Sequence, residues 1–233
     1  MIEILYGDIC NLYGDNGNIL LLEKYFGKDK IVHTGINDEP YFVNHKVKLI
    51  YLASMSENTE KIVISKLQPY KSKIKELIEN NVYILLTGNA LNVFSNKIID
   101  NEETKGLGIL KIDVKRSMKK RINCHYAGKF KKFKILGFKS QFTLNYSNDK
   151  KFLNTTLGFG NNYEDKNEGV KINNLYATNL LGPILVINPY FTKYLFEEMG
   201  YKKQLPYEKE LIKAYEVRLK EYELLEEAKK HEK

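Results

Sequence analysis

The side chains best suited to nucleophilic chemistry are two cysteines, Cys10 and Cys124. Cys10 follows an apolar run near the carboxyl edge of a predicted strand, where α/β proteins usually bind their ligands. It is a candidate nucleophile, although a lone cysteine in such a place more often packs as a small apolar residue. Cys124 precedes His125 on a strand-like run, whose successive side chains point to opposite faces, so the two residues form a poor catalytic dyad.

The other histidines, His33, His45 and His231, have no acidic partner at a motif spacing, and we expect them at the surface or in loops. The cysteines match neither a disulfide framework nor a metal-binding pattern. Nothing in the sequence calls for a cofactor or a metal ion.

A polar segment, Asp8–Asn18, leads from the first predicted strand into a helix. Asparagine and aspartate favour turns and helix caps, so we expect their side chains to fix this loop. Backbone amides near Gly17 offer a weaker alternative, an anion site at the start of the helix, but the pattern matches neither a dinucleotide-binding motif nor a P-loop. A third interpretation is that the loop faces a partner subunit.

Short apolar runs alternate with helical segments in the first part of the chain, which predicts a parallel α/β sheet. The predicted strands are Ile2–Tyr6, Ile31–Thr34, Val47–Leu52 and Val82–Leu86. The predicted helices are Ile19–Phe26, Glu57–Leu67, Pro69–Asn80 and Gly88–Ser95.

From Gly106 to Ala177 the sequence is typical of short β segments separated by Gly, Asn and Asp turns. The predicted segments are Leu107–Ile112, Arg121–Tyr126, Phe133–Phe138, Thr155–Phe159, Val170–Ile172 and Leu175–Ala177. We expect them to extend the sheet in an antiparallel or mixed manner, without forming a second domain.

A helix is predicted from Asn188-Pro189 to Met199, and a last helix follows Pro206. One face of the last helix is apolar, and its residues are Leu211, Tyr215, Leu219, Tyr222 and Leu225. We expect this face to pack on its own domain, with partner docking as the alternative. Residues 1–233 are therefore predicted to form a single domain with a helical extension over about residues 206–231.

The chain carries a formal net charge of +8, and its densest basic runs are Lys115–Arg121 and Lys129–Lys134. Lysine is spread along the whole sequence, so these runs indicate a general lysine bias more than a nucleic-acid groove. We find no apolar run long enough to span a membrane and no secretory leader. We therefore expect a cytoplasmic protein whose cysteines are reduced.

Several blocks resemble the glutamine amidotransferase subunit of lipid II isoglutaminyl synthase, in the cobyric-acid-synthase-like branch of class I glutamine amidotransferases. They occur in the family's order over nearly the whole chain. The blocks are Ile4–Ile19, Gly106–Leu110, Gly137-Phe138, Leu157–Asn162, Asn167–Val170 and Leu180–Leu185 with the following Asn188-Pro189. The resemblance implies a three-layer α/β, flavodoxin-like domain with a central mixed sheet.

The residues that carry catalysis in that family are replaced here. The family uses a cysteine on a strand-to-helix turn, a histidine base in a Leu-His-Gly-Pro block and the amides of a glycine-rich loop. Thr87 takes the place of the cysteine, and Leu181 takes the place of the histidine. The glycine-rich block reads Ala53–Asn58 without a glycine, and the family's Gly-Phe-Glu-Asn-His block reads Gly137–Gln141.

A threonine hydroxyl needs an adjacent base to act as a nucleophile, and Leu181 offers none. The resemblance therefore implies a pseudo-glutaminase that regulates or scaffolds a Mur-ligase-like synthase subunit in cell-wall precursor amidation. The alternatives are a hydrolase that uses Thr87 or Cys10, and a protein that only holds glutamine or a related small molecule. The binding or partner-facing candidates are Asp8, Asn11, Tyr13, Gly14, Asp15, Asn18 and Gly88.

Overall fold

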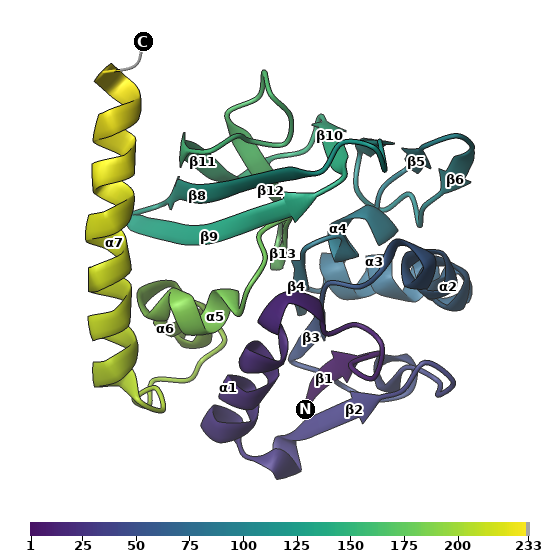
Figure 1. Ribbon diagram of the computed structural model, residues 1–233. Helices are drawn as coiled ribbons and strands as arrows, with labels where there is room; N and C mark the ends of the chain where they lie inside the picture. The colour runs from purple at the N-terminus through teal and green to yellow at the C-terminus, as the bar shows by residue number, and fades with distance from the viewer. Residues whose placement is uncertain (232–233) are drawn as a thin grey trace.

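The computed structural model describes residues 1–231, with side chains through Lys229. A nine-stranded mixed sheet forms its centre (Figure 1). The strands are β1 (Ile2–Leu5), β2 (Ile31–Thr34), β3 (Leu49–Leu52), β4 (Tyr83–Thr87), β8 (Ile122–Phe130), β9 (Phe133–Gln141), β11 (Lys151–Leu157), β12 (Asn167–Ile172) and β13 (Leu175–Thr178). Their order is β2-β1-β3-β4-β13-β12-β11-β8-β9. The sheet is parallel from β2 to β13 and antiparallel from β13 to β9.

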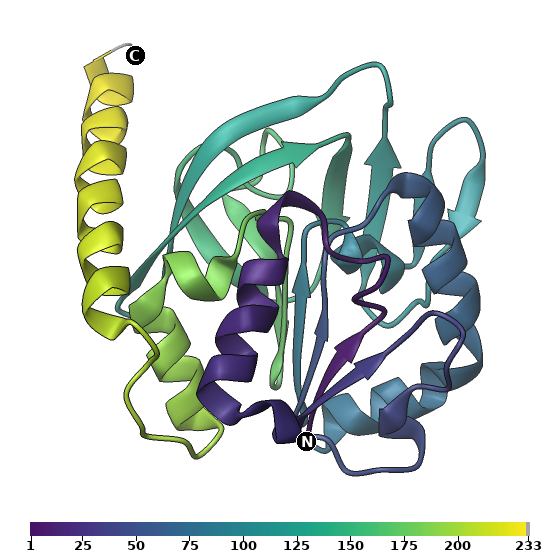
Figure 2. The same cartoon turned by 60° about the horizontal axis from the view of Figure 1, so that its bottom comes forward.

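Helices cover both faces of the parallel half, which confirms the three-layer architecture that the resemblance implied (Figures 1 and 2). One layer holds α1 (Asn16–Phe26), α5 (Ile184–Ile187) and α6 (Pro189–Glu198). The other holds α2 (Glu57–Leu67), α3 (Lys71–Glu79) and α4 (Ala90–Val93). The sequence periodicity located most of these elements to within a few residues.

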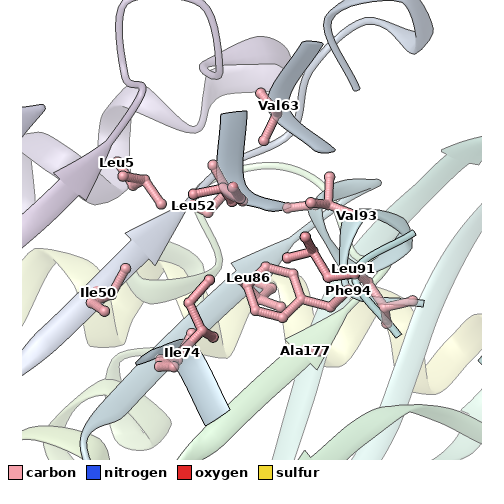
Figure 3. Packing of buried hydrophobic residues seen from close by; sticks show 14 of the residues in the cluster. Leu5, Ile50, Leu52, Val63, Ile74, Leu86, Leu91, Val93, Phe94 and Ala177 are labelled. Carbon is pink, nitrogen blue, oxygen red and sulfur yellow. The ribbon is translucent and has the colours of Figure 1, made fainter. Parts of the chain in front are cut away.

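The two faces of the sheet build two separate cores, because successive side chains of a strand point in opposite directions. In β3, Ile50 and Leu52 pack against α2, α3 and α4 (Figure 3), whereas Leu49 and Tyr51 pack toward α1 and α6. All residues of β3 and of β4 are buried. This burial explains why their sequences are almost continuously apolar rather than alternating.

A second, four-stranded sheet lies beside the main one, and the expectation of a single extended sheet was wrong at this point. Its strands are β5 (Lys97–Ile99), β6 (Glu103–Lys105), β7 (Ile112–Arg116) and β10 (Thr143–Ser147), in the order β10-β7-β5-β6. The segment predicted as strand Leu107–Ile112 is mostly a loop. Leu107 and Leu110 are fully buried in it, and their backbone N–H groups bond to carbonyls of Val93 and Phe94 at 2.8 Å.

The C-terminal helix α7 (Glu208–His231) packs across β8, β9 and β11. Tyr215 and Tyr222 are buried there, and Leu219 packs beside them. Leu225 is 40% exposed, so the expected apolar face packs on its own domain except at that residue. The side chain of His231 lies outside the described part of the chain. Within residues 1–231, no helix is both long and apolar enough to cross a bilayer.

Candidate functional site

The turn from β4 into α4 brings together three segments that are far apart in sequence. Gly88, in this turn, has a φ of 59°, a left-handed conformation that favours glycine. A Cβ on Gly88 would lie 2.6 Å from Ser54 Cβ and 2.9 Å from Leu181 Cδ2. The turn lies at the carboxyl ends of parallel strands, where α/β sheets place their binding sites. The structure thus brings the turn, the segment after β3 and Leu181 into contact.

The Thr87 hydroxyl is engaged inside the protein. Its Oγ1 donates to Asp15 Oδ2 at 3.1 Å and lies 3.2 Å from the Tyr51 hydroxyl. Thr87 is fully buried, and it does not line the cavity that opens beside the turn. The hydroxyl therefore has structural partners and no access to a ligand in that cavity.

Asp15 is the nearest base to Thr87, and this contact could not be predicted from the sequence because the two residues are 72 positions apart. Asp15 Oδ2 also accepts hydrogen bonds from the Ser54 backbone N–H at 2.9 Å and the Ser54 hydroxyl at 2.7 Å. Burial raises the pKa of the Asp15 carboxyl, while the bonds from Ser54 and Thr87 act in the opposite direction. Besides the Thr87 hydroxyl, Oδ2 accepts two hydrogen bonds from Ser54, and these bonds favour the charged carboxylate over its protonated form.

The other polar residues of the Asp8–Asn18 segment make different contacts. Asn11 Nδ2 donates to Gly7 O at 2.8 Å, which is the expected turn bond. Asp8 Oδ2 instead accepts from Ile36 N at 3.2 Å. Asn18 is fully buried, where its Nδ2 donates to the Tyr51 hydroxyl at 2.8 Å and its Oδ1 accepts from a backbone amide of α5. Asp15 and Asn18 are interior residues, so a partner's surface cannot reach them.

Tyr13 and Gly14, by contrast, are exposed at the mouth of the site. The Tyr13 hydroxyl accepts from Arg121 Nη2 at 2.6 Å, and the guanidinium carbon lies 5.2 Å from the centroid of the Phe142 ring. Tyr13 is therefore held by a cation that also stacks on a second aromatic ring. Together with the exposed Asp8, this loop stays available to a partner.

Three backbone amides around the turn are already bonded to protein acceptors. Ser54 N donates to Asp15, and Met55 N donates to Asn89 Oδ1 at 2.9 Å. Asn89 Nδ2 also donates to Met55 O at 2.9 Å, so its side chain holds both backbone groups of Met55. Gly88 N donates to Leu180 O at 3.2 Å. An oxyanion hole needs N–H groups that are free to bind the developing charge, and these three are not.

Leu181 is 5% exposed and packs on the Gly88 turn without offering a base. His33 and His45 lie elsewhere and are exposed, as expected, and His125 is exposed as well. His33 Nε2 lies 3.0 Å from Glu23 Oε1, His45 stacks on Tyr41, and His125 Nδ1 lies 3.3 Å from the Tyr222 hydroxyl.

Cys10 is fully buried, with its Sγ 3.9 Å from Met55 Sδ. Burial raises the pKa of its thiol to about 12, with a smaller contribution from the nearby Asp8 carboxylate. Because the thiolate is the reactive form, this environment disfavours a nucleophile. Burial also raises the pKa of the partly buried Cys124. Cys10 therefore packs as a small apolar residue.

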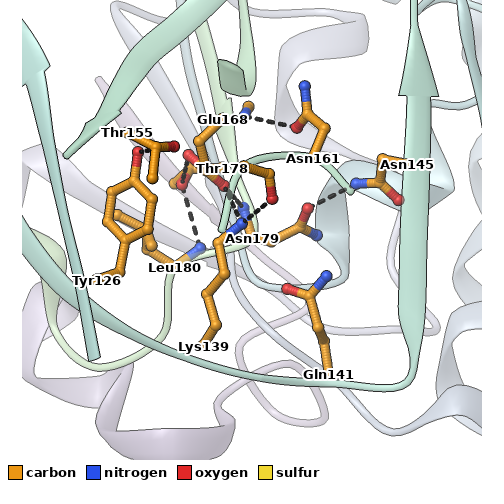
Figure 4. A network of polar contacts seen from close by, with 12 residues as sticks. Tyr126, Lys139, Gln141, Asn145, Thr155, Asn161, Glu168, Thr178, Asn179 and Leu180 are labelled. Carbon is orange, nitrogen blue, oxygen red and sulfur yellow. Dashed lines mark hydrogen bonds and ion pairs between the residues drawn. The ribbon is translucent and has the colours of Figure 1, made fainter. Parts of the chain in front are cut away.

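A second buried polar network surrounds Lys139 (Figure 4). This lysine stands where the family's Gly-Phe-Glu-Asn-His block has its glutamate. Lys139 is fully buried, and its Nζ donates to Gly160 O at 2.6 Å and lies 3.6 Å from Glu168 Oε1. Glu168 also accepts from Thr178 Oγ1 at 2.8 Å and Asn179 N at 2.9 Å. Burial lowers the pKa of Lys139, and the Glu168 carboxylate opposes that change. The network supports the turn through Asn179, whose Nδ2 donates to the carbonyl of the turn glycine at 3.3 Å.

The architecture matches solved structures of glutamine amidotransferases. One such enzyme aligns over 86% of this chain and 99% of its own length, with a TM-score of 0.55 and 12% identity. Another, from Thermotoga maritima, aligns over 93% of this chain and 91% of its own, with a TM-score of 0.50 and 10% identity. At these identities the likeness defines a class of fold, that of the glutamine amidotransferases.

The family follows from the sequence match. The model of the CobB/CobQ-like glutamine amidotransferase domain matches residues 1–188, and the chain belongs to this family. Subunit GatD of the glutamine-hydrolyzing lipid II isoglutaminyl synthase of Staphylococcus aureus is 30% identical over 232 residues, covering 97% of this chain and 95% of GatD. The same subunit of Streptococcus pneumoniae is 26% identical over 198 residues, covering 79% and 74%. These matches confirm the resemblance noted in the sequence.

Proposed function

We propose that this chain is a glutamine amidotransferase-like subunit without glutaminase activity. In this proposal it works with a Mur-ligase-like amidating subunit on a peptidoglycan precursor in the cytoplasm. The relatives support the pathway, because they are named as subunits of lipid II isoglutaminyl synthase. The structural observation that adds most to the replaced side chains is that the amides of Ser54, Met55 and Gly88 are bonded to protein acceptors.

The chemical reason is that glutamine hydrolysis needs three groups that act as one unit. The nucleophile position holds a buried hydroxyl, the base position holds Leu181, and the amides that would stabilise an oxyanion are occupied. Losing one group leaves room for a slow reaction, whereas losing all three removes attack, proton transfer and charge stabilisation together. What the fold retains is a surface loop and a partly enclosed cavity, which suit binding.

One observation favours a second candidate, a hydrolase that uses Thr87 with Asp15 as its base. Thr87 Oγ1 and Asp15 Oδ2 are 3.1 Å apart, which is a suitable distance for proton transfer. Against it, Thr87 is fully buried, and Asp15 Oδ2 already accepts two hydrogen bonds from Ser54. The first candidate therefore agrees better with the geometry.

Ammonia release from glutamine separates the two candidates. The native chain is assayed alone and together with a Mur-ligase-like partner. We expect no release in either case, and we expect the assembled pair to amidate its acceptor only when ammonium is supplied. Turnover that Thr87→Ala or Cys10→Ala abolishes would instead identify a replacement nucleophile. Co-elution of the two chains in size-exclusion chromatography tests the partnership separately.

A further inference from the structure

A second cavity, separate from the one beside the turn, lies where α2 and α3 face strand β6 (Figure 1). It is an open groove with a volume of about 920 Å³, and in the described part of the chain the two cavities share no lining residue. Gly106 and Gly108 of the Gly106–Leu110 block form part of its wall. This block takes no part in the site beside the turn, so the proposed function leaves the groove unexplained.

Three lysines line this groove and, among the described residues, no acidic residue does. They come from three elements, namely Lys61 from α2, Lys71 from the start of α3 and Lys105 from the end of β6. No described residue forms a hydrogen bond or an ion pair with any of these ammonium groups. The side chains of Ser65 and Gln68 add neutral donors to the lining, and they too have no described partner. Unpaired cations that gather on one groove create a positive potential that attracts anions.

The carboxylates next to the groove do not cancel this charge. Glu103, two positions before Lys105, forms an ion pair with Lys97 at 3.1 Å. Asp113 contacts the lining only through Asn96, whose Nδ2 donates to Asp113 Oδ1 at 3.2 Å. Even with the Asp113 carboxylate counted, the lysines are in excess, so the groove keeps a positive charge.

The glycine block makes room for one of these lysines. A Cβ on Gly108 would lie 3.3 Å from Lys71 Nζ, so the missing side chain leaves space for the ammonium group. Gly108 also has a φ of 59°, a left-handed conformation that favours glycine. A Cβ on Gly106 would lie 2.3 Å from Ser95 O, so the backbone of the block packs directly on the segment before β5. Lys71 is half-buried, and its ammonium group lies against this wall of the groove.

The charge and the size of the groove indicate a small phosphorylated ligand. A phosphate monoester carries a charge of about −1.5 to −2 at neutral pH, so three lysines exceed what one phosphate group balances, and a diphosphate matches them better. Small-molecule sites have volumes of about 300–1,000 Å³, and the groove falls in that range. Ile64 and Pro69 line the same groove and offer an apolar surface. We infer that the three lysines bind the diphosphate group of a small organic molecule, whose carbon skeleton packs on Ile64 and Pro69.

Titrations of the native chain with three phosphates test the inference. Isothermal titration calorimetry compares ADP, AMP and inorganic pyrophosphate at neutral pH, at low salt and without magnesium. We expect ADP to bind about tenfold more tightly than AMP, because one phosphate leaves a lysine without a partner. ADP should also bind more tightly than pyrophosphate, which has no carbon skeleton to bury, and sodium chloride should weaken the binding by screening. Failure of ADP to bind, or equal affinities for ADP and AMP, would overturn the inference. Pyrophosphate that binds as tightly as ADP would overturn the role of Ile64 and Pro69.

A matched set of variants locates the site. Lys71→Gln removes one charge from the groove, and we expect it to weaken ADP binding about tenfold. Lys71→Arg keeps the charge and should retain most of the binding. Lys213→Gln removes the same charge at an exposed position on α7 and should leave the affinity unchanged. Equal losses at the two positions would mean that the net charge of the chain attracts ADP, and they would overturn the groove as the site.

Two further measurements keep these outcomes separate from other effects. Thermal unfolding without ligand checks that the variants are folded, and the Lys71 side chain has no described partner whose loss would destabilise the chain. Ammonia release from glutamine is measured alongside, because the inference does not rest on the proposed function. Ammonia release would defeat the pseudo-glutaminase proposal and leave the groove unaffected, whereas a native chain that does not bind ADP would defeat the diphosphate inference alone.

Discussion

Asp15 is the residue on which the polar contacts beside the turn converge. Its carboxylate links the loop before α1 to Ser54 after β3 and to Thr87 at the end of β4. Burial nevertheless raises its pKa, because the charged form loses hydration that these bonds do not fully replace. Its protonation is therefore coupled to folding.

The pH dependence of stability should report this coupling. The folded protein holds the Asp15 proton to higher pH than the unfolded chain, whose aspartates titrate at about 3.9. Unfolding in this window releases a proton, so ionisation of Asp15 lowers stability as the pH rises, by at most about 1.4 kcal/mol per pH unit. The stability of the native chain relative to Asp15→Asn should fall as the pH rises from about 4. Urea unfolding at several pH values measures it, and a constant or growing difference would contradict the coupling.

Lys139 is fully buried and lies beside one carboxylate, that of the fully buried Glu168. We expect Lys139→Met to lower the free energy of unfolding by about 3–5 kcal/mol, because the buried Glu168 carboxylate then lacks a counter-charge. Adding Glu168→Gln should recover most of the loss. The matched control is Lys119→Met at an exposed position, where we expect a change within about 0.5 kcal/mol. If urea unfolding gives the two variants the same loss in free energy of unfolding, the Lys139–Glu168 ion pair does not contribute as expected.

At the scale of elements, part of the edge strand β9 is covered by the Asn188 side chain, and Leu181 N donates to Phe138 O at 2.9 Å farther along the strand. Asn188 Oδ1 accepts from Leu136 N at 2.8 Å, and Asn188 Nδ2 donates to Leu136 O at 2.9 Å. The same Nδ2 also bonds to Ile184 O at 3.0 Å, so that Asn188 ties α5 to β9. An open strand edge is prone to pair with other chains, and this clamp covers part of it.

Asn188→Ala should be strongly destabilising, because it leaves both backbone groups of the buried Leu136 without partners. At about 1–3 kcal/mol for each of the two groups, the expected loss is about 2–6 kcal/mol. Asn154→Ala, on the exposed side of β11, is the matched control and should have little effect. The urea midpoints of the two variants provide the test. A loss for Asn188→Ala as small as that for Asn154→Ala would contradict the prediction and mean that water takes over the hydrogen bonds to Leu136.

The elements that the sequence predicted well include α2, whose apolar residues recur at helical spacing. Leu107 and Leu110 misled the prediction, because apolar residues buried by a loop look like a strand when only hydrophobicity is read. The candidate positions Thr87 and Leu181 could be located from block order. The bonds of Asp15 to Thr87 and of Asn89 to Met55 could not, since they join residues 72 and 34 positions apart.

At the scale of the whole molecule, α7 serves as a cover for the antiparallel half of the sheet. Residues of β8, β9 and β11 form a small core with Tyr215 and Tyr222. The Tyr222 hydroxyl also donates to Gly137 O at 2.9 Å, and the Tyr215 hydroxyl donates to Lys134 O at 2.8 Å. The helix thus buries apolar residues of this half of the sheet and also donates hydrogen bonds to β9.

Removing α7 should lower the melting temperature. A chain that ends at Pro206 loses the burial of two tyrosines, worth about 1.5–3 kcal/mol each. For a protein of this size the loss corresponds to a decrease of about 6 °C or more. A chain that ends at Glu227 keeps both tyrosines and should melt close to the full-length protein. Differential scanning calorimetry measures all three, and equal melting of the Pro206 and Glu227 chains would contradict this role of the helix.

The occupied amides beside the turn would make the proposed loss of catalysis hard to reverse. Installing Thr87→Cys and Leu181→His restores two side chains, but Ser54 N and Met55 N stay bonded to Asp15 and Asn89. Freeing those amides first would strip a buried carboxylate of its donors before any activity is regained. Under the proposed function, no single substitution would therefore restore hydrolysis, because the side chains and the amides would have to change together.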